Sequence, residues 1–254
     1  MKKNNLFYQY YDSLYAEKDY SGEVKTLLSI AKKYRNAEIK NILEIGCGTG
    51  NHTVEFAKTK NKITAIDTDV YMAEIAKSKT QKLKNINIHF GTVEKLNEKG
   101  FDVGFAMFNV ITYIPDLKSL LSFFNGVSAA VKNNGIFIFD CWNGIAAIKD
   151  PPKSKTFHKN VDDKKITCEL DSKTDFQNQK VKLSYTIHLK DKKGKALGKD
   201  SFSFDQTLWT PLEIKYALES TNFEVIECCK NFQPGKSANE SDLKIMFICR
   251  NNRS

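Results

Sequence analysis

The first 150 residues alternate short apolar runs with segments of helical periodicity. Five runs rich in β-branched and aromatic residues have the length of strands: NILEI (41–45), KITAI (62–66), INIHF (86–90), DVGFAM (102–107) and GIFIFD (135–140). The segments between them have helical spacing; the segment 117–131 places on one face Leu117, Leu120, Leu121, Phe124, Val127 and Val131. Nearly continuous apolar strands that alternate with helices predict a parallel sheet covered by helices on both faces.

A different pattern begins after residue 150. The segments 165–176, 180–189 and 200–209 alternate polar and apolar residues, which predicts three half-exposed antiparallel strands. A helix then begins at Thr210, because Pro211 stands at its first position and Glu213 completes a capping box. Two strands, 223–229 and 243–250, close the chain. We therefore expect one α/β domain, residues 1–150 and 209–254, interrupted by an antiparallel insert at 151–208.

Composition narrows the class of protein. A chain of 254 residues with 41% apolar and 11% aromatic residues buries a large core, which excludes intrinsic disorder. Six cysteines without a CxxC spacing predict reduced thiols, and four dispersed histidines predict no structural metal. The apolar runs are far shorter than the ~20 residues of a membrane-spanning helix. The N-terminal MKKNNLFYQYYD lacks the apolar core of a secretory signal, so we expect a cytoplasmic protein without membrane association.

The net charge of +9 lies mostly in the insert. Residues 153–200 contain 13 Lys against 7 Asp and Glu, a net charge of +6. Few aromatic residues alternate with these lysines, so the stacking surface that binds single-stranded nucleic acid is missing and a nucleic-acid partner is not favoured. Two interpretations stay open: a solvated basic face, or attraction of an anionic small molecule such as a nucleotide sugar toward a neighbouring pocket.

A glycine-rich turn carries the chemistry. In ILEIGCGTGNHT, the glycines Gly46, Gly48 and Gly50 lie between the first strand and a helix start, where the backbone can approach a ligand and N–H groups are free. The next strand ends at Asp67, 21 residues after Gly46, and a carboxylate there can accept hydrogen bonds from both hydroxyls of a ribose. The spacing predicts a nucleoside-containing cofactor. The glycine-rich turn matches neither the dinucleotide fingerprint G-x-G-x-x-G nor a triphosphate-binding loop.

The segment ILEIGCGTG resembles, residue for residue, the first motif of the class I S-adenosylmethionine-dependent methyltransferases. This resemblance covers essentially the whole chain and implies S-adenosylmethionine as cofactor, in a Rossmann-like sheet of seven strands in the order 3-2-1-4-5-7-6 with an antiparallel last strand. In the family's third motif Thr92 stands where Asp is usual. The resemblance implies cofactor contacts from Tyr20, Glu44, Gly46, Cys47, Gly48, Gly50, Asp67, Thr68, Met72, Thr92, Val93 and Met107.

Other segments bear on the methyl acceptor. Enzymes that methylate nucleobases usually carry a [DN]PP[YFW] or a Pro-Cys motif after the fourth strand, and this chain has neither motif there. Cys141 follows the fifth strand and is better explained as a small buried residue. The segments 10–20, 106–114 and 139–144, together with the insert, resemble amino-sugar N-methyltransferases and, more distantly, glycine/sarcosine N-methyltransferases. The resemblance implies that Tyr11 and Tyr15 cover the cofactor and acceptor, and that Asn109 and Tyr113 line the acceptor pocket.

Methyl transfer is an in-line displacement that needs positioning more than a catalytic dyad, and the sequence shows no dyad. The leading hypothesis is therefore methyl transfer to the amine of a small molecule. Two alternatives stay open: an RNA methyltransferase, suggested by charge alone, and a non-catalytic cofactor-binding or dimerisation module of the same fold. The insert could serve as a substrate lid or as the surface of a homodimer. Trp142 fits a pocket wall or the core, and His52 fits a cofactor neighbour or a solvated helix position.

Overall fold

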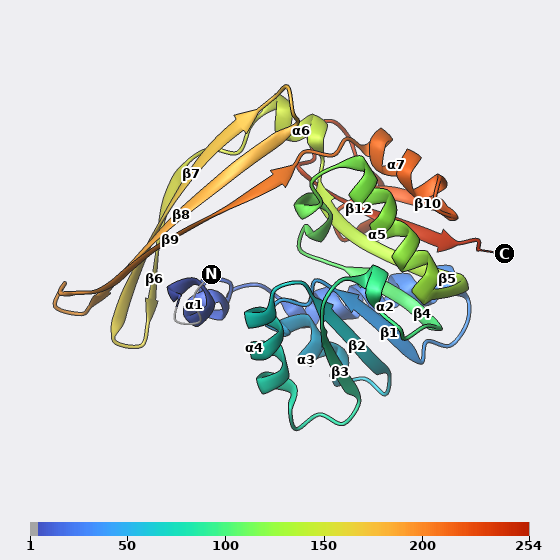
Figure 1. Cartoon of the computed structure of the whole chain (residues 1–254), viewed down its shortest axis with the longest axis horizontal. Coiled ribbons are helices and arrows are strands. Elements are labelled where there is room, and N and C mark those ends of the chain that lie inside the picture. The colour runs from blue at the N-terminus through green and yellow to red at the C-terminus, as the bar shows by residue number, and fades with distance from the viewer. Residues whose placement is uncertain (1–4, 254) are drawn as a thin grey trace.

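The structure is a computed structural model, and it describes residues 5–253. An eight-stranded sheet forms the body of the described chain, in the order β11-β10-β12-β5-β4-β1-β2-β3 (Figure 1). Its strands are β1 (Asn41–Ile45), β2 (Lys62–Asp67), β3 (Ile86–Phe90), β4 (Phe101–Ala106), β5 (Val131–Trp142), β10 (Phe223–Lys230), β11 (Gln233–Ser237) and β12 (Lys244–Asn251). β3, β2, β1, β4 and β5 are parallel, whereas β12 is antiparallel to β5 and to β10.

The predicted α/β class, strand order and antiparallel last strand are confirmed, but the count of seven is wrong. The eighth strand, β11, pairs only with β10 at the edge of the sheet. Its sequence, QPGKS, has no apolar alternation and its residues are mostly exposed, so hydrophobic patterning could not indicate it.

Helices cover both faces of the sheet. α5 (Leu117–Ala130) and α7 (Pro211–Glu219) pack over a core rich in phenylalanine, and α2 (Tyr20–Arg35) and α3 (Asn51–Ala57) cover the other face. The capping box that begins α7 is present as predicted. The predicted face of α5 is wrong at its ends, because Leu117 is 44% exposed and Val131 already belongs to β5. Within the helix, it missed the buried Phe123.

The insert is a separate four-stranded antiparallel sheet, in the order β6-β7-β8-β9. Its strands are β6 (Lys155–Val161), β7 (Lys164–Asp175), β8 (Lys180–Asp191) and β9 (Ala196–Thr207). The prediction of three strands missed β6, whose sequence KTFHKNV is mostly polar and which forms one edge. The apolar face of the insert packs through Ile166, Ile187 and Leu189 onto Phe7 and Met72.

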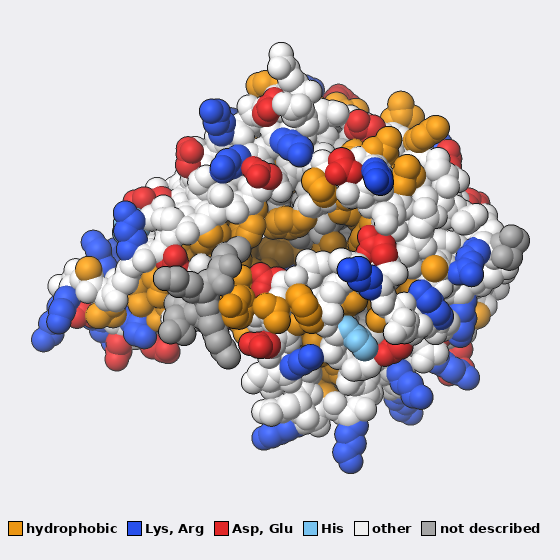
Figure 2. All heavy atoms as spheres, viewed as in Figure 1, with side chains coloured by type: hydrophobic (Ala, Val, Ile, Leu, Met, Phe, Trp, Pro, Cys, Tyr) orange, Lys and Arg blue, Asp and Glu red, His pale blue; other side chains and the backbone are white. Residues whose placement is uncertain are grey.

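A short helix, α1 (Leu6–Leu14), lies between the insert and α4 (Val70–Thr80) (Figure 1). Its N-cap is Asn5, whose side-chain oxygen accepts a hydrogen bond from the N–H of Phe7 at 2.7 Å. Figure 2 shows that the molecule is hollowed between the insert and the main sheet, with hydrophobic side chains on the floor of the hollow. The remaining helices are α6 (Gly144–Lys149) and two 3-10 turns, η1 (Val93–Lys95) and η2 (Val110–Tyr113).

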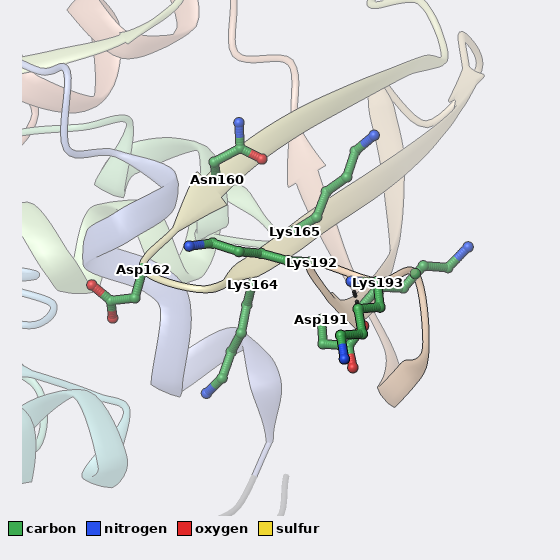
Figure 3. A pocket seen from close by; sticks show the side chains of 9 residues that line it. Asn160, Asp162, Lys164, Lys165, Asp191, Lys192 and Lys193 are labelled. Carbon is green, nitrogen blue, oxygen red and sulfur yellow. Dashed lines mark hydrogen bonds between the residues drawn. The ribbon is translucent and has the colours of Figure 1, made fainter.

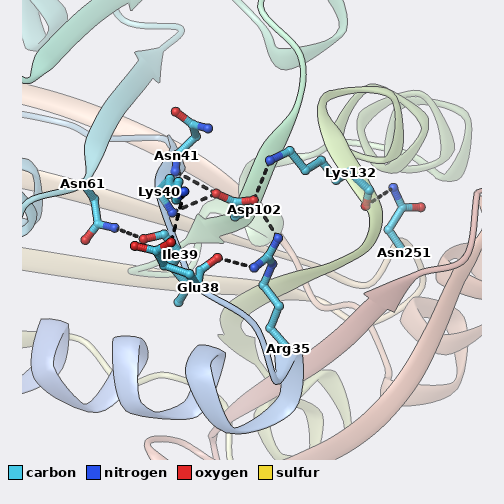
Figure 4. A network of polar contacts seen from close by, with 9 residues as sticks. All are labelled: Arg35, Glu38, Ile39, Lys40, Asn41, Asn61, Asp102, Lys132 and Asn251. Atoms are coloured by element: carbon cyan, nitrogen blue, oxygen red, sulfur yellow. Dashed lines mark hydrogen bonds and ion pairs between the residues drawn. The ribbon is translucent and has the colours of Figure 1, made fainter.

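A buried carboxylate ties the opposite, amino-terminal edge of the sheet together (Figure 4). Asp102 on β4 is 2% exposed; its Oδ1 accepts from Arg35 Nη2 at 2.6 Å and from Lys132 Nζ at 2.7 Å. Its Oδ2 accepts from the backbone N–H groups of Lys40 at 2.8 Å and Asn41 at 2.9 Å. One side chain therefore joins α2, the start of β1, β4 and β5.

All six cysteines are free thiols, and Cys141 is fully buried in the core as predicted. Across residues 5–253, no three side chains of the metal-ligating types come together in a group that could hold a metal ion. In the same residues, no helix combines the length and the apolar character needed to cross a membrane.

Candidate cofactor and acceptor site

The glycine-rich turn sits at the carboxyl end of β1, as the sequence predicted. The N–H groups of Gly46 and Cys47 both donate to the carbonyl of Ile66, at 2.8 and 3.1 Å, which fastens the turn to the end of β2. Gly46 has φ +70°, and a Cβ there would lie 2.4 Å from Val110. Gly48 also has a positive φ, +54°, but a Cβ on it would meet nothing within 4 Å. The turn is therefore closed on one side and open on the other, where a ligand can lie against the backbone.

Asp67 ends β2 beside this open turn. Its Oδ2 accepts from the N–H of Gly48 at 2.7 Å, and its Oδ1 accepts from the N–H of Asp69 at 2.8 Å. Burial raises the pKa of the Asp67 carboxyl above its ordinary value, and the backbone hydrogen bonds work against that rise. Two predicted site residues, 19 positions apart, are thus in direct contact.

Three of the predicted site residues have buried apolar side chains, each in a different core cluster. Met72 on α4 and Val93 on η1 are both buried, and Met107, directly after β4, is 5% exposed. Thr92 is the N-cap of η1 and is half-buried, whereas Thr68 is exposed. A small hollow of about 230 Å³ adjoins Thr92 and is also lined by Ile66, Phe90 and Leu96.

Glu44 is buried under the turn, not in open contact with the hollow. It is 4% exposed, and its Oε2 accepts from Thr53 Oγ1 at 2.6 Å. Burial raises the pKa of Glu44 to about 7, and it also raises the pKa of the Cys47 thiol well above its ordinary value. The thiol is therefore protonated near neutral pH and has little nucleophilic character.

Tyr20 begins α2 and its ring meets the ring of His52 edge to face, with centroids 4.9 Å apart. His52 is 7% exposed, and its Nε2 lies 2.7 Å from Glu23 Oε2. Glu23 also forms an ion pair with Lys18. The interpretation of His52 as a solvated helix residue is wrong, because α2 packs over α3 and covers it.

Helix α1 is bonded directly to the cofactor turn. Asp12 Oδ1 accepts from Thr49 Oγ1 at 2.6 Å and from Asn51 Nδ2 at 3.0 Å. Its Oδ2 accepts from Lys79 Nζ at 2.7 Å. Tyr8, one turn earlier in α1, donates its hydroxyl hydrogen to Asp69 Oδ2 at 2.7 Å. Helix α1 is therefore fastened to the glycine-rich turn and to α4.

The four predicted acceptor residues come from two elements, α1 and η2, which both contact the insert beside the hollow. Tyr11 and Tyr15, on and directly after α1, have ring centroids 4.8 Å apart, and Tyr15 meets Phe108 edge to face at 5.1 Å. Tyr113 ends η2, is 49% exposed, and meets Phe204 of the insert edge to face at 5.8 Å. Asn109 is the buried N-cap of η2.

Burial raises the pKa of each tyrosine in this group. The pKa of Tyr185 on the insert rises to about 12, and those of Tyr11, Tyr15 and Tyr113 also rise, with burial the largest cause in each case. All four are therefore neutral phenols near pH 7. They can form walls and hydrogen bonds, but they do not serve as proton acceptors.

Several residues of the site were not predicted. Asp12 bonds to Thr49, Glu23 to His52 and Asp69 to Tyr8, contacts that arise only because segments far apart in sequence pack together. Lys18 forms an ion pair with Glu23. Asp140 had a usable signal: it is the one acidic residue in the apolar run GIFIFD, and it lies near the carboxyl end of a central strand, where ligands bind in this class of sheet. Trp142 is half-buried against the insert, near Val181 and Leu183.

Lysines at the tips of the β6–β7 and β8–β9 hairpins lie around a second hollow of about 670 Å³, whose lining includes Asn160, Lys164, Lys165, Lys190 and Lys193 (Figure 3). Lys164 Nζ donates to the hydroxyl of Tyr10 at 3.0 Å. None of the predicted site residues belongs to this second hollow.

Comparison with known proteins agrees with this geometry. Residues 42–135, which contain the glycine-rich turn and Asp67, match the family described as "Methyltransferase domain". A putative methyltransferase of Geobacillus sp. is 26% identical over 137 residues, which are 53% of this chain and 55% of that protein. The chain spans about half the length of the curated relatives it matches.

Solved structures resemble the main sheet and the insert together. The crystal structure of an S-adenosylmethionine-dependent methyltransferase from Clostridium acetobutylicum superimposes with a TM-score of 0.80 at 19% identity, over 96% of this chain and 97% of that one. CalS10, an amino pentose methyltransferase from Micromonospora echinaspora, superimposes with a TM-score of 0.76 at 16% identity, over 98% and 99% of the two chains. At these identities the likeness shows a shared fold.

Proposed function

We propose that this protein is an S-adenosylmethionine-dependent methyltransferase that methylates an amine of a small molecule. The observation that carries the proposal is the contact between Asp67 and the open side of the glycine-rich turn. The Asp67 carboxylate suits a ribose diol, and the space beside Gly48, where a Cβ would meet nothing within 4 Å, suits the atoms next to the ribose. The buried side chains Met72 and Val93 suit the faces of an adenine. The residues present therefore fit this cofactor.

The other cofactor contacts that we propose lie on the glycine-rich turn and on the helices and strand ends next to it. Tyr20 and His52 border it from α2 and α3, Thr68 and Thr92 border it from the ends of β2 and β3, and Met107 follows β4. The proposed set is Tyr20, Glu44, Gly46, Cys47, Gly48, Gly50, Asp67, Thr68, Met72, Thr92, Val93 and Met107.

When bound, S-adenosylmethionine supplies a methyl group already activated by a sulfonium. The chain then needs to hold an amine in line with that methyl group and to exclude water. Tyr11, Tyr15 and Tyr113 form an aromatic enclosure whose ring faces favour the positive charge that an amine gains on methylation. Because these phenols stay neutral, the amine must arrive unprotonated, and we expect the rate to rise with pH up to the amine's own pKa.

We further propose that the two parts of the chain divide these tasks. Residues 1–150 and 209–254 bind the cofactor, and the insert, residues 151–208, shapes the acceptor pocket through Tyr185 and Phe204. CalS10, which shares the fold, is described as an amino pentose methyltransferase, and that description favours an amino sugar, free or nucleotide-linked. A cytoplasmic location suits such a metabolite, and a homodimer through the insert remains part of this proposal.

Isothermal titration calorimetry with S-adenosylmethionine tests the cofactor site. We expect Asp67→Ala to weaken binding by at least about 100-fold, since it removes two charge-assisted hydrogen bonds of about 1.5–3 kcal/mol each. Asp163→Ala, at an 82% exposed position of the insert, is the matched control and should bind as the wild type does. Unchanged affinity in Asp67→Ala would refute the site.

Methyl transfer is tested on a panel of glycine, sarcosine, glucosamine and a nucleotide-linked amino sugar, with radiolabelled S-adenosylmethionine. Transfer to one of these amines supports the proposal. Tight cofactor binding without transfer to any amine, but with salt-dependent binding and methylation of RNA, would replace it with the RNA methyltransferase.

A further inference from the structure

Two consecutive residues after β4 have left-handed backbone conformations. Phe108 has φ +71° and Asn109 has φ +62°, and neither is glycine. A non-glycine residue in this region costs of order 1–3 kcal/mol, and such a conformation persists only where the surroundings hold it. The turn lies at the acceptor hollow, where the Phe108 ring meets Tyr15 at 5.1 Å.

Asp140 holds this turn from the neighbouring strand. Its Oδ1 accepts from the backbone N–H of Asn109 at 2.9 Å. On the other side of the same residue, the carbonyl of Asn109 accepts from the N–H of Thr112 at 3.1 Å and from its hydroxyl at 2.7 Å. Asp140 is 2% exposed and has no ion-pair partner within 4 Å among the described residues. A buried carboxylate of this kind is costly, so its hydrogen bond to Asn109 is its clearest contribution.

The turn leaves one polar atom unsatisfied. Asn109 is 8% exposed, and its side-chain Oδ1 is buried without a hydrogen-bond partner. An unpaired buried acceptor costs about 1–3 kcal/mol, and a ligand N–H that reached it would remove that cost. An amine that attacks through its lone pair has its N–H groups free to donate to such an oxygen.

We propose that Asp140 is a positioning residue for the methyl acceptor: it fixes the left-handed Phe108–Asn109 turn so that Asn109 Oδ1 accepts an N–H of the attacking amine. The inference rests on the proposed function. It also restricts the acceptor, because a tertiary amine has no N–H to donate. Primary and secondary amines are accordingly the substrate class.

A double-mutant cycle with the best amine of the panel tests this inference. Asp140→Ala and Asn109→Gly should each lower kcat/KM by about 30-fold or more; glycine keeps the left-handed backbone but removes the side-chain oxygen. If Asp140 acts through Asn109, the double variant should be within about threefold of Asn109→Gly alone. Asp140→Asn, whose amide oxygen can still accept from the Asn109 N–H, should recover most of the activity. Losses that multiply in the double variant would overturn the inference.

A second measurement does not depend on activity. In protein labelled with 15N-asparagine, the Asn109 amide resonance, identified by its loss in Asn109→Gly, should shift as Asp140 titrates, with a midpoint above the ordinary carboxyl value of 3.8, because burial raises the pKa of Asp140. The shift should be absent in Asp140→Asn. An Asn109 amide that does not respond to pH in the wild type would refute the contact. Failure of the proposed function is distinct, since the wild type itself would then transfer no methyl group to any amine.

Discussion

The carboxylate at the amino-terminal edge of the sheet makes a sharp prediction about stability. In Asp102→Asn, the new NH2 group must face either the backbone N–H groups of Lys40 and Asn41 or the cations of Arg35 and Lys132. In either orientation two donors lose their acceptor. Removing one partner of a buried ion pair destabilises a protein by roughly 3–5 kcal/mol. For a chain of this length, that corresponds to a fall of about 6–20 °C in Tm.

The measurement is urea unfolding followed by far-UV circular dichroism at pH 7.5, with thermal unfolding beside it. Lys132→Ala is the matched control. The Lys132 side chain is 43% exposed, whereas that of Arg35 is 13% exposed. We expect the control to lose less than about 1 kcal/mol, as is usual for exposed ion pairs. A loss below about 1 kcal/mol in Asp102→Asn would refute the reasoning.

The pH dependence has a definite sign. Burial raises the pKa of Asp102, but hydrogen bonds from Lys132 and the backbone, with the charge of Arg35, outweigh it and hold the pKa below the ordinary value of 3.8. A carboxyl whose folded pKa is depressed stabilises the protein above its unfolded pKa of about 3.9, and this contribution is lost as pH falls through the folded value. The difference between wild type and variant should be constant from pH 5 to 8 and shrink below about pH 4.

Two further predictions concern helix α1 and the cysteine thiols. Asp12→Ala removes the contacts of α1 with Thr49, Asn51 and Lys79. Stopped-flow measurement should therefore show S-adenosylhomocysteine dissociating about tenfold faster, with Tm nearly unchanged. An unchanged dissociation rate would show that α1 does not control release. Burial raises the pKa of every cysteine thiol, that of half-buried Cys228 to about 11. Ellman's reagent at pH 8 should therefore react quickly with less than one thiol in the native protein and with six after unfolding. Rapid reaction of several native thiols would contradict the packing.

The fold was largely readable from the sequence because the parallel strands are apolar on both faces. Such strands appear in the sequence as continuous apolar runs. Their order in the sheet follows from short, right-handed crossover connections. Among the elements missed, α1, β6 and β11 have polar or aromatic sequences without a strict period. Their structure depends on neighbours distant in the chain, which local patterning does not record.

The candidate site divides in the same way. Gly46, Gly48 and Asp67 were predictable because a turn and the end of the next parallel strand always meet at one edge of such a sheet. Asp12 and Asp140 were not predicted, since their contacts with Thr49 and Asn109 join segments 37 and 31 residues apart. Their proximity results from tertiary packing.

The insert has a consequence for how this protein can vary. The chain enters the antiparallel sheet after α6 and leaves it at Trp209, whose carbonyl accepts from the N–H of Gly144 at 2.9 Å. A Cβ on Gly144 would lie 2.2 Å from the carbonyl oxygen of Leu208. Only glycine therefore allows the chain before the insert, at Gly144, to contact the chain after it, at Leu208 and Trp209. An excursion of some 60 residues therefore begins and ends at nearly one point in space. Lengthening, shortening or exchanging it changes loop-closure entropy only slowly, and leaves the register of β5 and β12 undisturbed.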